Sequence, residues 1–129
     1  MELRKVLVTM PVDAGYQEQF AGALPGAEFT YARYDELTPE QLAAFDAAVG
    51  DPAPGALSKL SGLRLLQLNS SGVPADCLTL RDSHPGLVLC STSGAFGQAI
   101  SEHMAAALLM LMKRLHTYRD AMKQGAWQS

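Results

Sequence analysis

The sequence predicts an α/β fold in which a parallel five-stranded sheet is covered by helices on both faces. Short runs of aliphatic and β-branched residues alternate with longer segments of helical pattern along the chain. Gly and Pro separate these segments, and 48% hydrophobic with 18% charged residues is typical of a globular protein. Over 129 residues this alternation predicts one doubly wound, flavodoxin-like sheet followed by a long final helix.

The elements follow one another in regular order. The first strand is expected in the run KVLVTM, which ends at Pro11, and the clearest strand is LRLLQL, which ends in a polar loop containing Gly72. The predicted strands cover 5–10, 27–32, 46–51, 63–72 and 86–94, and the predicted helices cover 14–23, 38–45, 55–60, 75–80 and 98–124.

The helix over 38–45 has the most specific start signal. Thr38 stands at the N-cap, Pro39 at the first helical position, and Gln41 three residues after the cap. This spacing is a capping box, in which the two side chains satisfy each other's backbone N–H groups.

The final helix has the strongest functional signal of the elements. The nine residues from Met104 to Met112 include no polar side chain, and a helix that is apolar all round must be buried all round. One side can pack on the sheet, and the other needs a second domain or a second subunit. We therefore expect a homodimer or higher oligomer through helix 98–124, with Gly125 ending the helix.

Composition excludes several classes of protein. The net charge is −3 and the Lys and Arg residues are scattered, so no basic face predicts nucleic-acid binding. The longest apolar run is too short to cross a bilayer, and no signal peptide is visible. Cys77 and Cys90 lack framework or metal spacing, and His84 and His116 are not at ligand spacing. We expect a soluble, cytoplasmic protein without a metal.

In a parallel sheet, ligands bind beyond the carboxyl ends of the strands. The loops at 10–15, 51–55, 69–74 and 91–97 all follow predicted strands and therefore lie at that edge. A flavin site is disfavoured because the first loop is poor in hydroxyls and Gly. A phospho-receiver would use Asp51, but no Lys follows the last strand. No G-x-G-x-x-G motif is present for a dinucleotide.

The loop NSSGVP at 69–74 predicts a site for a carboxylate. Its serines bring hydroxyl groups, and Gly72 is expected to let the backbone turn so that the N–H groups of Ser71, Gly72 and Val73 point outward. The alternative is an ordinary strand-to-helix turn with a Ser or Asx cap. Farther along, Glu102 and His103 are neighbours that cannot share a helix face, and we expect Glu102 to be a first-turn acid that favours the helix dipole.

Two segments together carry a family likeness: LRLLQLNSSGV, and GLVLCSTSG followed by AFGQAISEHMAAALLMLMKRLHTYRDAMKQGAW. They resemble the NAD-dependent D-isomer-specific 2-hydroxyacid dehydrogenases, the family of glycerate, phosphoglycerate and D-lactate dehydrogenases. The resemblance implies a flavodoxin-like substrate domain at 1–97 and a crossing helix at 98–127 that leads into a Rossmann domain. It implies that the family's catalytic Arg, Glu and His and its Gly-rich NAD loop lie outside these 129 residues.

The resemblance also assigns roles within this chain. Ser71, Gly72 and Val73 match the loop whose backbone N–H groups hold the substrate carboxylate, and Ser71 also approaches the nicotinamide. Met104 matches a position near the nicotinamide, and Ala95 and Phe96 match the variable loop that lines the cleft. Pro74 departs from the family, which often has Asp there.

The activity implied is hydride transfer between NAD or NADP and a small 2-oxo or 2-hydroxy acid. We expect the 129-residue chain alone to be inactive, because no catalytic residue can be assigned in it. The alternative is a free-standing binding or dimerisation module that shares the fold but has no catalysis.

Overall fold

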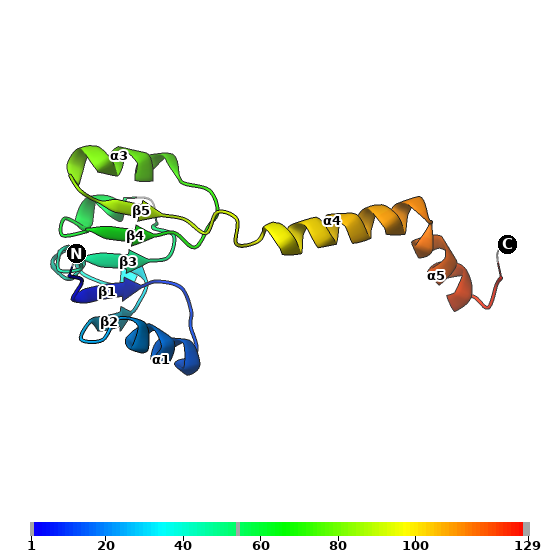
Figure 1. Cartoon of the computed structure of the whole chain (residues 1–129), viewed down its shortest axis with the longest axis horizontal. Helices are drawn as coiled ribbons and strands as arrows, with labels where there is room; N and C mark the ends of the chain where they lie inside the picture. Colours follow the sequence, from blue (N-terminus) through cyan, green and yellow to red (C-terminus); the bar gives the residue numbers. More distant parts are fainter. Residues whose placement is uncertain (1, 54, 128–129) are drawn as a thin grey trace. The chain divides into compact units, whose positions relative to one another are not determined.

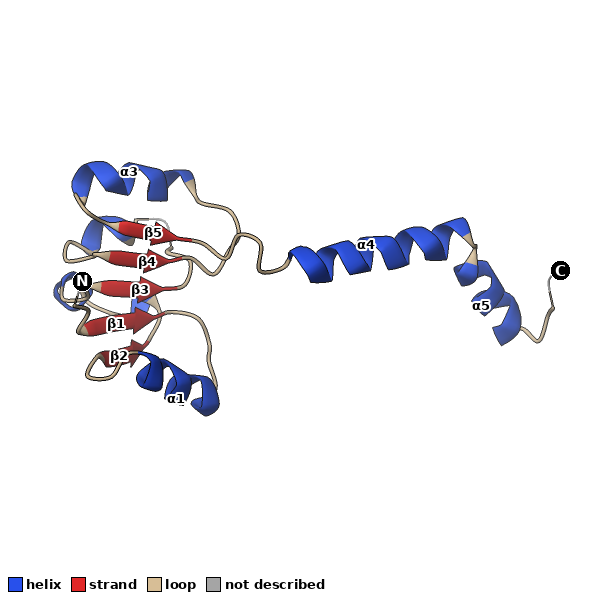
Figure 2. Cartoon of the chain, viewed as in Figure 1, coloured by secondary structure: helices blue, strands red, loops and turns tan. Residues whose placement is uncertain are grey.

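The structure of the chain is a computed structural model that describes residues 2–53 and 55–127. It divides into two compact units, one up to Ser93 and one from Gly94 onward. The first unit contains a sheet with its helices, and the second contains helices alone (Figures 1 and 2).

All five strands of the first unit run parallel in the order β2-β1-β3-β4-β5 (Figure 1). This order is the flavodoxin-like one that the alternating pattern predicts. The strands are β1 (Lys5–Val8), β2 (Glu28–Tyr31), β3 (Ala47–Val49), β4 (Leu65–Gln67) and β5 (Val88–Cys90). The connecting helices are α1 (Ala14–Ala23), α2 (Pro39–Ala43) and α3 (Ala75–Ser83), with two 3-10 helices, η1 (Tyr34–Glu36) and η2 (Leu57–Lys59).

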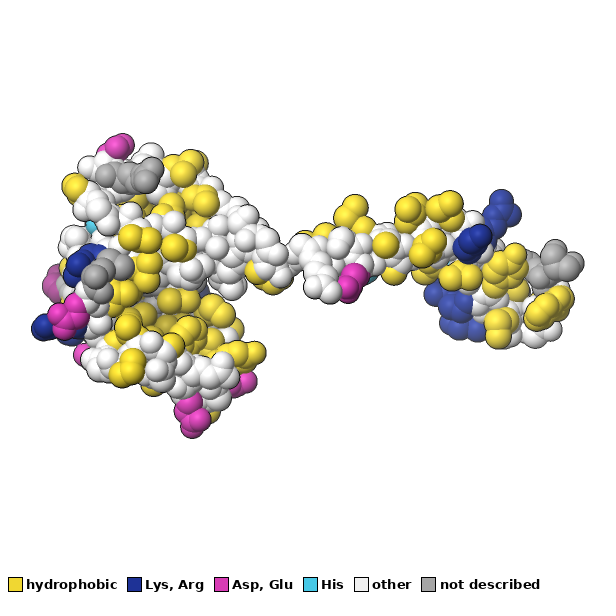
Figure 3. All heavy atoms as spheres, in the orientation of Figure 1, with side chains coloured by type: hydrophobic (Ala, Val, Ile, Leu, Met, Phe, Trp, Pro, Cys, Tyr) yellow, Lys and Arg dark blue, Asp and Glu magenta, His cyan; other side chains and the backbone are white. Residues whose placement is uncertain are grey.

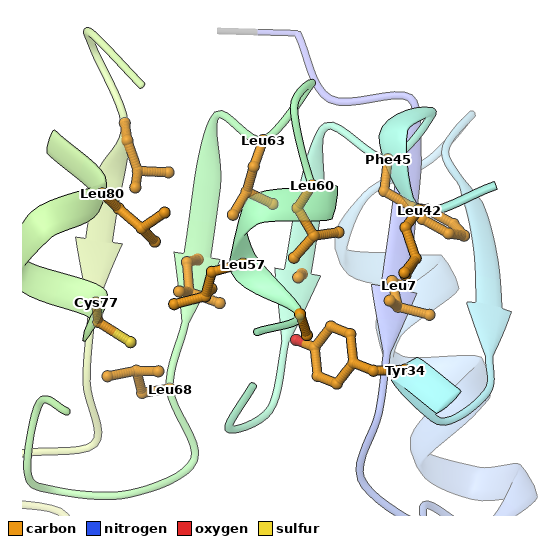
Figure 4. Close-up of a cluster of buried hydrophobic side chains, with 14 residues drawn as sticks. Leu7, Tyr34, Leu42, Phe45, Leu57, Leu60, Leu63, Leu68, Cys77 and Leu80 are labelled. Atoms are coloured by element: carbon orange, nitrogen blue, oxygen red, sulfur yellow. The ribbon is translucent and has the colours of Figure 1, made fainter. Parts of the chain in front are cut away.

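Successive side chains of the strands enter two separate hydrophobic clusters, one on each face of the sheet. On β1, Leu7 joins the larger cluster, whereas Val6 and Val8 join the smaller one, around Phe20 of α1. The larger cluster packs α2, η2 and α3 against the sheet (Figure 4). Leu66 of β4, which belongs to this cluster, is completely buried. Helices therefore cover both faces, as the near-continuous apolar strands predict.

Local start signals agree with the structure at single residues. Thr38 Oγ1 accepts from the Gln41 N–H at 3.3 Å, and the Thr38 N–H donates to Gln41 Oε1 at 2.8 Å. This is the predicted capping box, with Pro39 opening α2. The segment predicted as a helix over 55–60 is instead the 3-10 turn η2, whose Leu57 and neighbouring Leu60 insert into the core.

The second unit corrects the prediction of a single helix over 98–124. It contains α4 (Gly97–Met112) and α5 (Leu115–Lys123), separated at Arg114, whose φ of 52° is left-handed. The Arg114 carbonyl accepts from the Thr117 and Tyr118 N–H groups and so begins α5. The break lets α5 pack against α4 and bury Ala121, which a continuous helix would leave exposed.

The surface of the second unit is strongly apolar (Figure 3). Exposed apolar side chains stand on all sides of α4 and continue onto α5. They are Ile100, Met104, Leu108, Leu109, Met110, Leu111, Met112, Leu115, Tyr118 and Met122. Within the described residues, no helix is long and apolar enough to cross a membrane. Gly125 has a positive φ of 69° just after α5, which confirms its predicted place at the helix end.

Candidate functional site

The loops that follow the strands meet at one edge of the sheet (Figure 2). Two hydrogen bonds join the loop after β5 to the loop after β4. Thr92 Oγ1 donates to the Asn69 carbonyl at 2.9 Å, and the Thr92 N–H donates to the Ser70 carbonyl at 3.1 Å. The loop predicted to bind a carboxylate is therefore fixed on one side by its neighbour.

Asp51, in the loop after β3, fixes the same loop from its other side. Its Oδ1 atom accepts from the Asn69 N–H at 3.1 Å, the Ser70 N–H at 3.1 Å and the Ser70 hydroxyl at 3.0 Å. The Ser70 Oγ atom also lies 2.9 Å from the Gly72 carbonyl oxygen. Because the hydroxyl has a single proton, it donates either to Asp51 or to this carbonyl. Polar groups from three consecutive loops thus define the backbone path of 69–72.

The next three N–H groups are left for a ligand. Ser71, Gly72 and Val73 are all exposed, and their N–H groups donate to no acceptor among the described residues. Asn69 and Ser70 direct their N–H groups to a protein carboxylate, whereas the three that follow have no such partner. Consecutive unpaired N–H groups on a braced loop are an arrangement that suits an anion.

Gly72 does not use a backbone conformation that favours glycine. Its φ does not lie in the left-handed region, and a Cβ placed there would meet no atom within 4 Å. Another residue could therefore take the same turn. What glycine provides here is open space above the backbone, which allows close approach of a ligand.

The alternative interpretation, an ordinary strand-to-helix turn with a Ser or Asx cap, is wrong about the cap. The N-cap of α3 is Pro74, whose side chain cannot accept a hydrogen bond, and no side chain caps the helix. The Ser70 hydroxyl bonds within its own loop and to Asp51.

The other predicted site residues lie in the second unit. Ala95 and Phe96 directly precede α4, and Met104 lies on α4, all of them exposed. Glu102 is not a first-turn acid, because α4 begins at Gly97 and Glu102 accepts from the Gln98 amide at 2.9 Å. Within the described residues, no group of three or more His, Cys, Asp or Glu side chains is arranged to hold a metal.

A cavity of about 670 Å³ lies at the carboxyl ends of β1, β2 and β3. It is at the switch point between β1 and β3, where the strand order reverses. Asp51 lies in the wall of this cavity and is also hydrogen-bonded to the loop at 69–74, which is called the carboxylate loop below. The cavity is lined by residues 8–12, residues 31–36, Asp51 and Ala53.

Tyr34 is the buried titratable group of this cavity wall. Its side chain packs among leucines of the larger cluster (Figure 4), and burial raises the pKa of its phenol to about 12. The nearby Thr9 hydroxyl acts in the opposite direction. Thr9 itself donates to the Val49 carbonyl at 3.3 Å, and the Tyr34 hydroxyl completes no hydrogen bond of acceptable geometry within the described residues.

Arg33 and Asp35 form an exposed ion pair beside Tyr34. The Arg33 guanidinium donates to both Asp35 oxygens at 2.9 and 3.0 Å, and this hydrogen bonding lowers the pKa of the Asp35 carboxyl. The pair places opposite charges side by side at the cavity wall.

Sequence reasoning missed the part that Asp51 plays. Its position after a predicted strand is visible in the sequence and is the position of a phospho-acceptor in a phospho-receiver. Its actual hydrogen bonds reach residues 18 and 19 positions away, so no local motif indicates them.

Several solved structures resemble this chain. A D-isomer specific 2-hydroxyacid dehydrogenase family protein from Aeromonas salmonicida is 27% identical, with a TM-score of 0.78 over 98% of this chain and 41% of that one. A glycerate dehydrogenase related protein from Thermoplasma acidophilum is 25% identical, with a TM-score of 0.57 over 97% and 40%. D-lactate dehydrogenase from Aquifex aeolicus, in complex with NAD and lactic acid, has the same fold at 17% identity, with a TM-score of 0.75 over 98% and 39%.

No protein-family model and no curated protein matches the sequence. The solved structures are more than twice as long as this chain, which spans 38–42% of the length of those compared. The chain is thus a structural match to part of the D-isomer-specific 2-hydroxyacid dehydrogenases, the family that its sequence resembles.

Proposed function

We propose that this chain is the part of a D-isomer-specific 2-hydroxyacid dehydrogenase that binds the substrate carboxylate and forms one wall of the cleft. The observation that carries the proposal is that three consecutive exposed residues, Ser71, Gly72 and Val73, have N–H groups with no acceptor among the described residues. They stand on a loop held by Asp51 and Thr92. The structural match to this family supports the same role.

The chemistry of the loop suits a 2-oxo acid. Backbone N–H groups have a fixed direction, so a bound carboxylate would be held in one orientation. That orientation would place the adjacent 2-oxo carbon at a defined distance from the loop. The loop carries no titratable side chain at Ser71, Gly72 or Val73, so its part is to bind and orient, and not to transfer a proton.

The residues of this chain do not fit a complete dinucleotide. The loop after β1 contains Pro11, which lacks an N–H, and the chain has no G-x-G-x-x-G motif to receive a pyrophosphate. When bound, NAD(P)H supplies the hydride of the family reaction. We propose that the nucleotide is held mainly by a domain outside these residues, with Ser71 and Met104 facing the nicotinamide. The D-lactate dehydrogenase from Aquifex aeolicus, which has the same fold, is complexed with NAD and lactic acid, and this supports a nicotinamide cofactor for the reaction.

The binding part of the proposal can be tested on the 129-residue chain. Isotopically labelled protein is titrated with oxamate, an unreactive analogue of a 2-oxo acid, and backbone amide signals are followed by NMR. We expect saturable shifts centred on Ser71, Gly72 and Val73, with a Kd of roughly 1 mM or weaker because half the cleft is absent.

A matched pair of variants makes the test specific. Gly72→Ala places a methyl group in open space, so the fold is kept while the approach of the ligand is blocked. Gly22→Ala on α1 adds the same methyl group in open space far along the chain and should leave oxamate binding unchanged. Equal oxamate affinity of Gly72→Ala and the wild type would contradict the proposed site.

We further propose that α4 and α5 assemble with a second copy of the chain. The observation that favours this is the continuous exposed apolar surface around Met104, Leu108 and Leu111. Monomeric proteins rarely expose so much contiguous apolar area. Light scattering over a wide concentration range should give at least the dimer mass, and a monomer at all concentrations would contradict assembly.

A further inference from the structure

Asp51 stands where it can control the carboxylate loop without itself touching the ligand. It follows Gly50 at the end of β3, and its Oδ1 atom accepts three hydrogen bonds from Asn69 and Ser70. Its Oδ2 atom has no hydrogen-bond partner within the described residues. One oxygen therefore makes every contact to the loop.

We propose that Asp51 is a positioning residue of the carboxylate site, which rests on the function proposed above. By accepting the Asn69 and Ser70 N–H groups on one side of the loop, it leaves the following three N–H groups directed away from the protein. Without this acceptor, the N–H groups of Asn69 and Ser70 would be unpaired, the Ser70 hydroxyl would keep only the Gly72 carbonyl as acceptor, and the backbone of 69–72 would be held less firmly. The three donors that follow would then no longer be kept in one arrangement.

The charge of Asp51 works against its geometric role. A carboxylate that is hydrogen-bonded to the loop of an anion site repels the incoming anion, and solvent screens this repulsion only in part. Since Oδ1 alone contacts the loop, the two effects can be separated by substitution. Asp51→Asn keeps the Oδ1 acceptor in place and removes the charge, whereas Asp51→Ala removes both.

Asp46 provides a matched control at the other end of the same strand. It precedes β3, and its carboxylate accepts from the Arg4 N–H at 2.9 Å and the Lys5 N–H at 3.1 Å. Asp46→Ala therefore removes an aspartate that also binds two backbone N–H groups, but at the amino edge of the sheet. It should affect stability without affecting the carboxylate loop.

The experiment measures two quantities on the 129-residue chain and its variants. The first is amide hydrogen exchange of Asn69 and Ser70 relative to Leu66 in β4, which reports whether the loop is held. The second is the Kd for oxamate from NMR titration. In Asp51→Ala we expect faster exchange at both loop amides with Leu66 unchanged, and a Kd weakened about tenfold, as for loss of one charged hydrogen bond.

In Asp51→Asn we expect wild-type protection of the loop amides and a Kd tightened about two- to fivefold, because the repulsion is gone. Asp46→Ala should keep the wild-type Kd. Wild-type exchange at Asn69 and Ser70 in Asp51→Ala would overturn the positioning role, and so would unchanged oxamate affinity in that variant. If the wild type fails to bind oxamate, the proposed function fails, while the exchange data still decide whether Asp51 holds the loop.

Discussion

Gly50 is the residue that brings Asp51 to the end of β3, and we predict that Gly50→Ala is strongly destabilising. Its φ is +121°, a value that L-residues rarely adopt. A Cβ built at Gly50 would lie 2.1 Å from Thr9 Oγ1, which is far inside contact distance. The Gly50 N–H also donates to the Gln67 carbonyl at 2.9 Å, so this backbone cannot shift without losing a bond between β3 and β4.

The magnitude follows from these contacts. Holding alanine in a sparsely populated backbone region costs about 1–3 kcal/mol. Thr9 must also rotate, which breaks its 3.3 Å hydrogen bond to the Val49 carbonyl and costs about 0.5–1.5 kcal/mol. We therefore expect Gly50→Ala to lower the free energy of unfolding by about 2–4 kcal/mol, a large part of the usual stability of a small domain.

The assay is urea unfolding followed by circular dichroism, with one control variant and one second background. Gly22→Ala is the control: it lies in the last turn of α1 with open space around it and should raise stability by at most about 0.5–1 kcal/mol. In a Thr9→Ala background the clash with Oγ1 is absent, so Gly50→Ala should cost about 1 kcal/mol less there. A cost below about 1 kcal/mol in the wild-type background would refute both the strain and the contact.

The remaining predictions use other parts of the molecule. Leu66→Ala should cost about 2–5 kcal/mol in urea unfolding because Leu66 is fully buried, whereas Leu78→Ala on the exposed side of α3 should cost less than about 0.5 kcal/mol. The pKa of Tyr34 is raised in the folded state to about 12, so the contribution of its protonated phenol to stability is complete below about pH 10 and is lost between about pH 10 and 12. Over that range a Tyr34→Phe variant should show a smaller fall in the free energy of unfolding than the wild type. An equal fall in both proteins would contradict the raised pKa. Leu108→Glu with Leu111→Glu should make the chain monomeric by sedimentation equilibrium, and an unchanged oligomer would show that α4 is not the interface. The purified 129-residue chain should not oxidise NADH in the presence of pyruvate, as followed by absorbance, and turnover above the buffer rate would contradict the proposed division of the site.

The sequence predicted most of the fold because the signals of these elements are local. The capping box at Thr38 and Gln41 is contained in four residues, and the structure reproduces it hydrogen bond by hydrogen bond. The break at Arg114 was not predictable in this way, since neither Gly nor Pro occurs within 98–124. It depends on the packing of α5 against α4, which no local pattern records.

The same distinction applies to the site. Ser71, Gly72 and Val73 could be named from a Ser- and Gly-rich loop after a strand, and in the structure these residues are exposed and their N–H groups donate to no acceptor among the described residues. Their support comes from Asp51 and Thr92, which lie on other loops and meet them only because β3, β4 and β5 are neighbours. That Gly72 makes its turn without a positive φ could not be seen from the sequence, because φ depends on the whole path of the loop and not on its composition.

The strand order has a consequence for how quickly the first unit can fold. β1 is the first strand in the chain, and one of its two partners is β3, from which it is separated in sequence by β2 and α2. Val6, for example, pairs with Ala47. Every neighbouring pair is parallel, so each requires a crossover and none can start from a tight hairpin. Such non-local pairing slows folding, because loop-closure entropy is lost before contacts compensate for it. We therefore expect β1–β3 docking to limit the folding rate, with β5 and the loops of the carboxylate site ordering last.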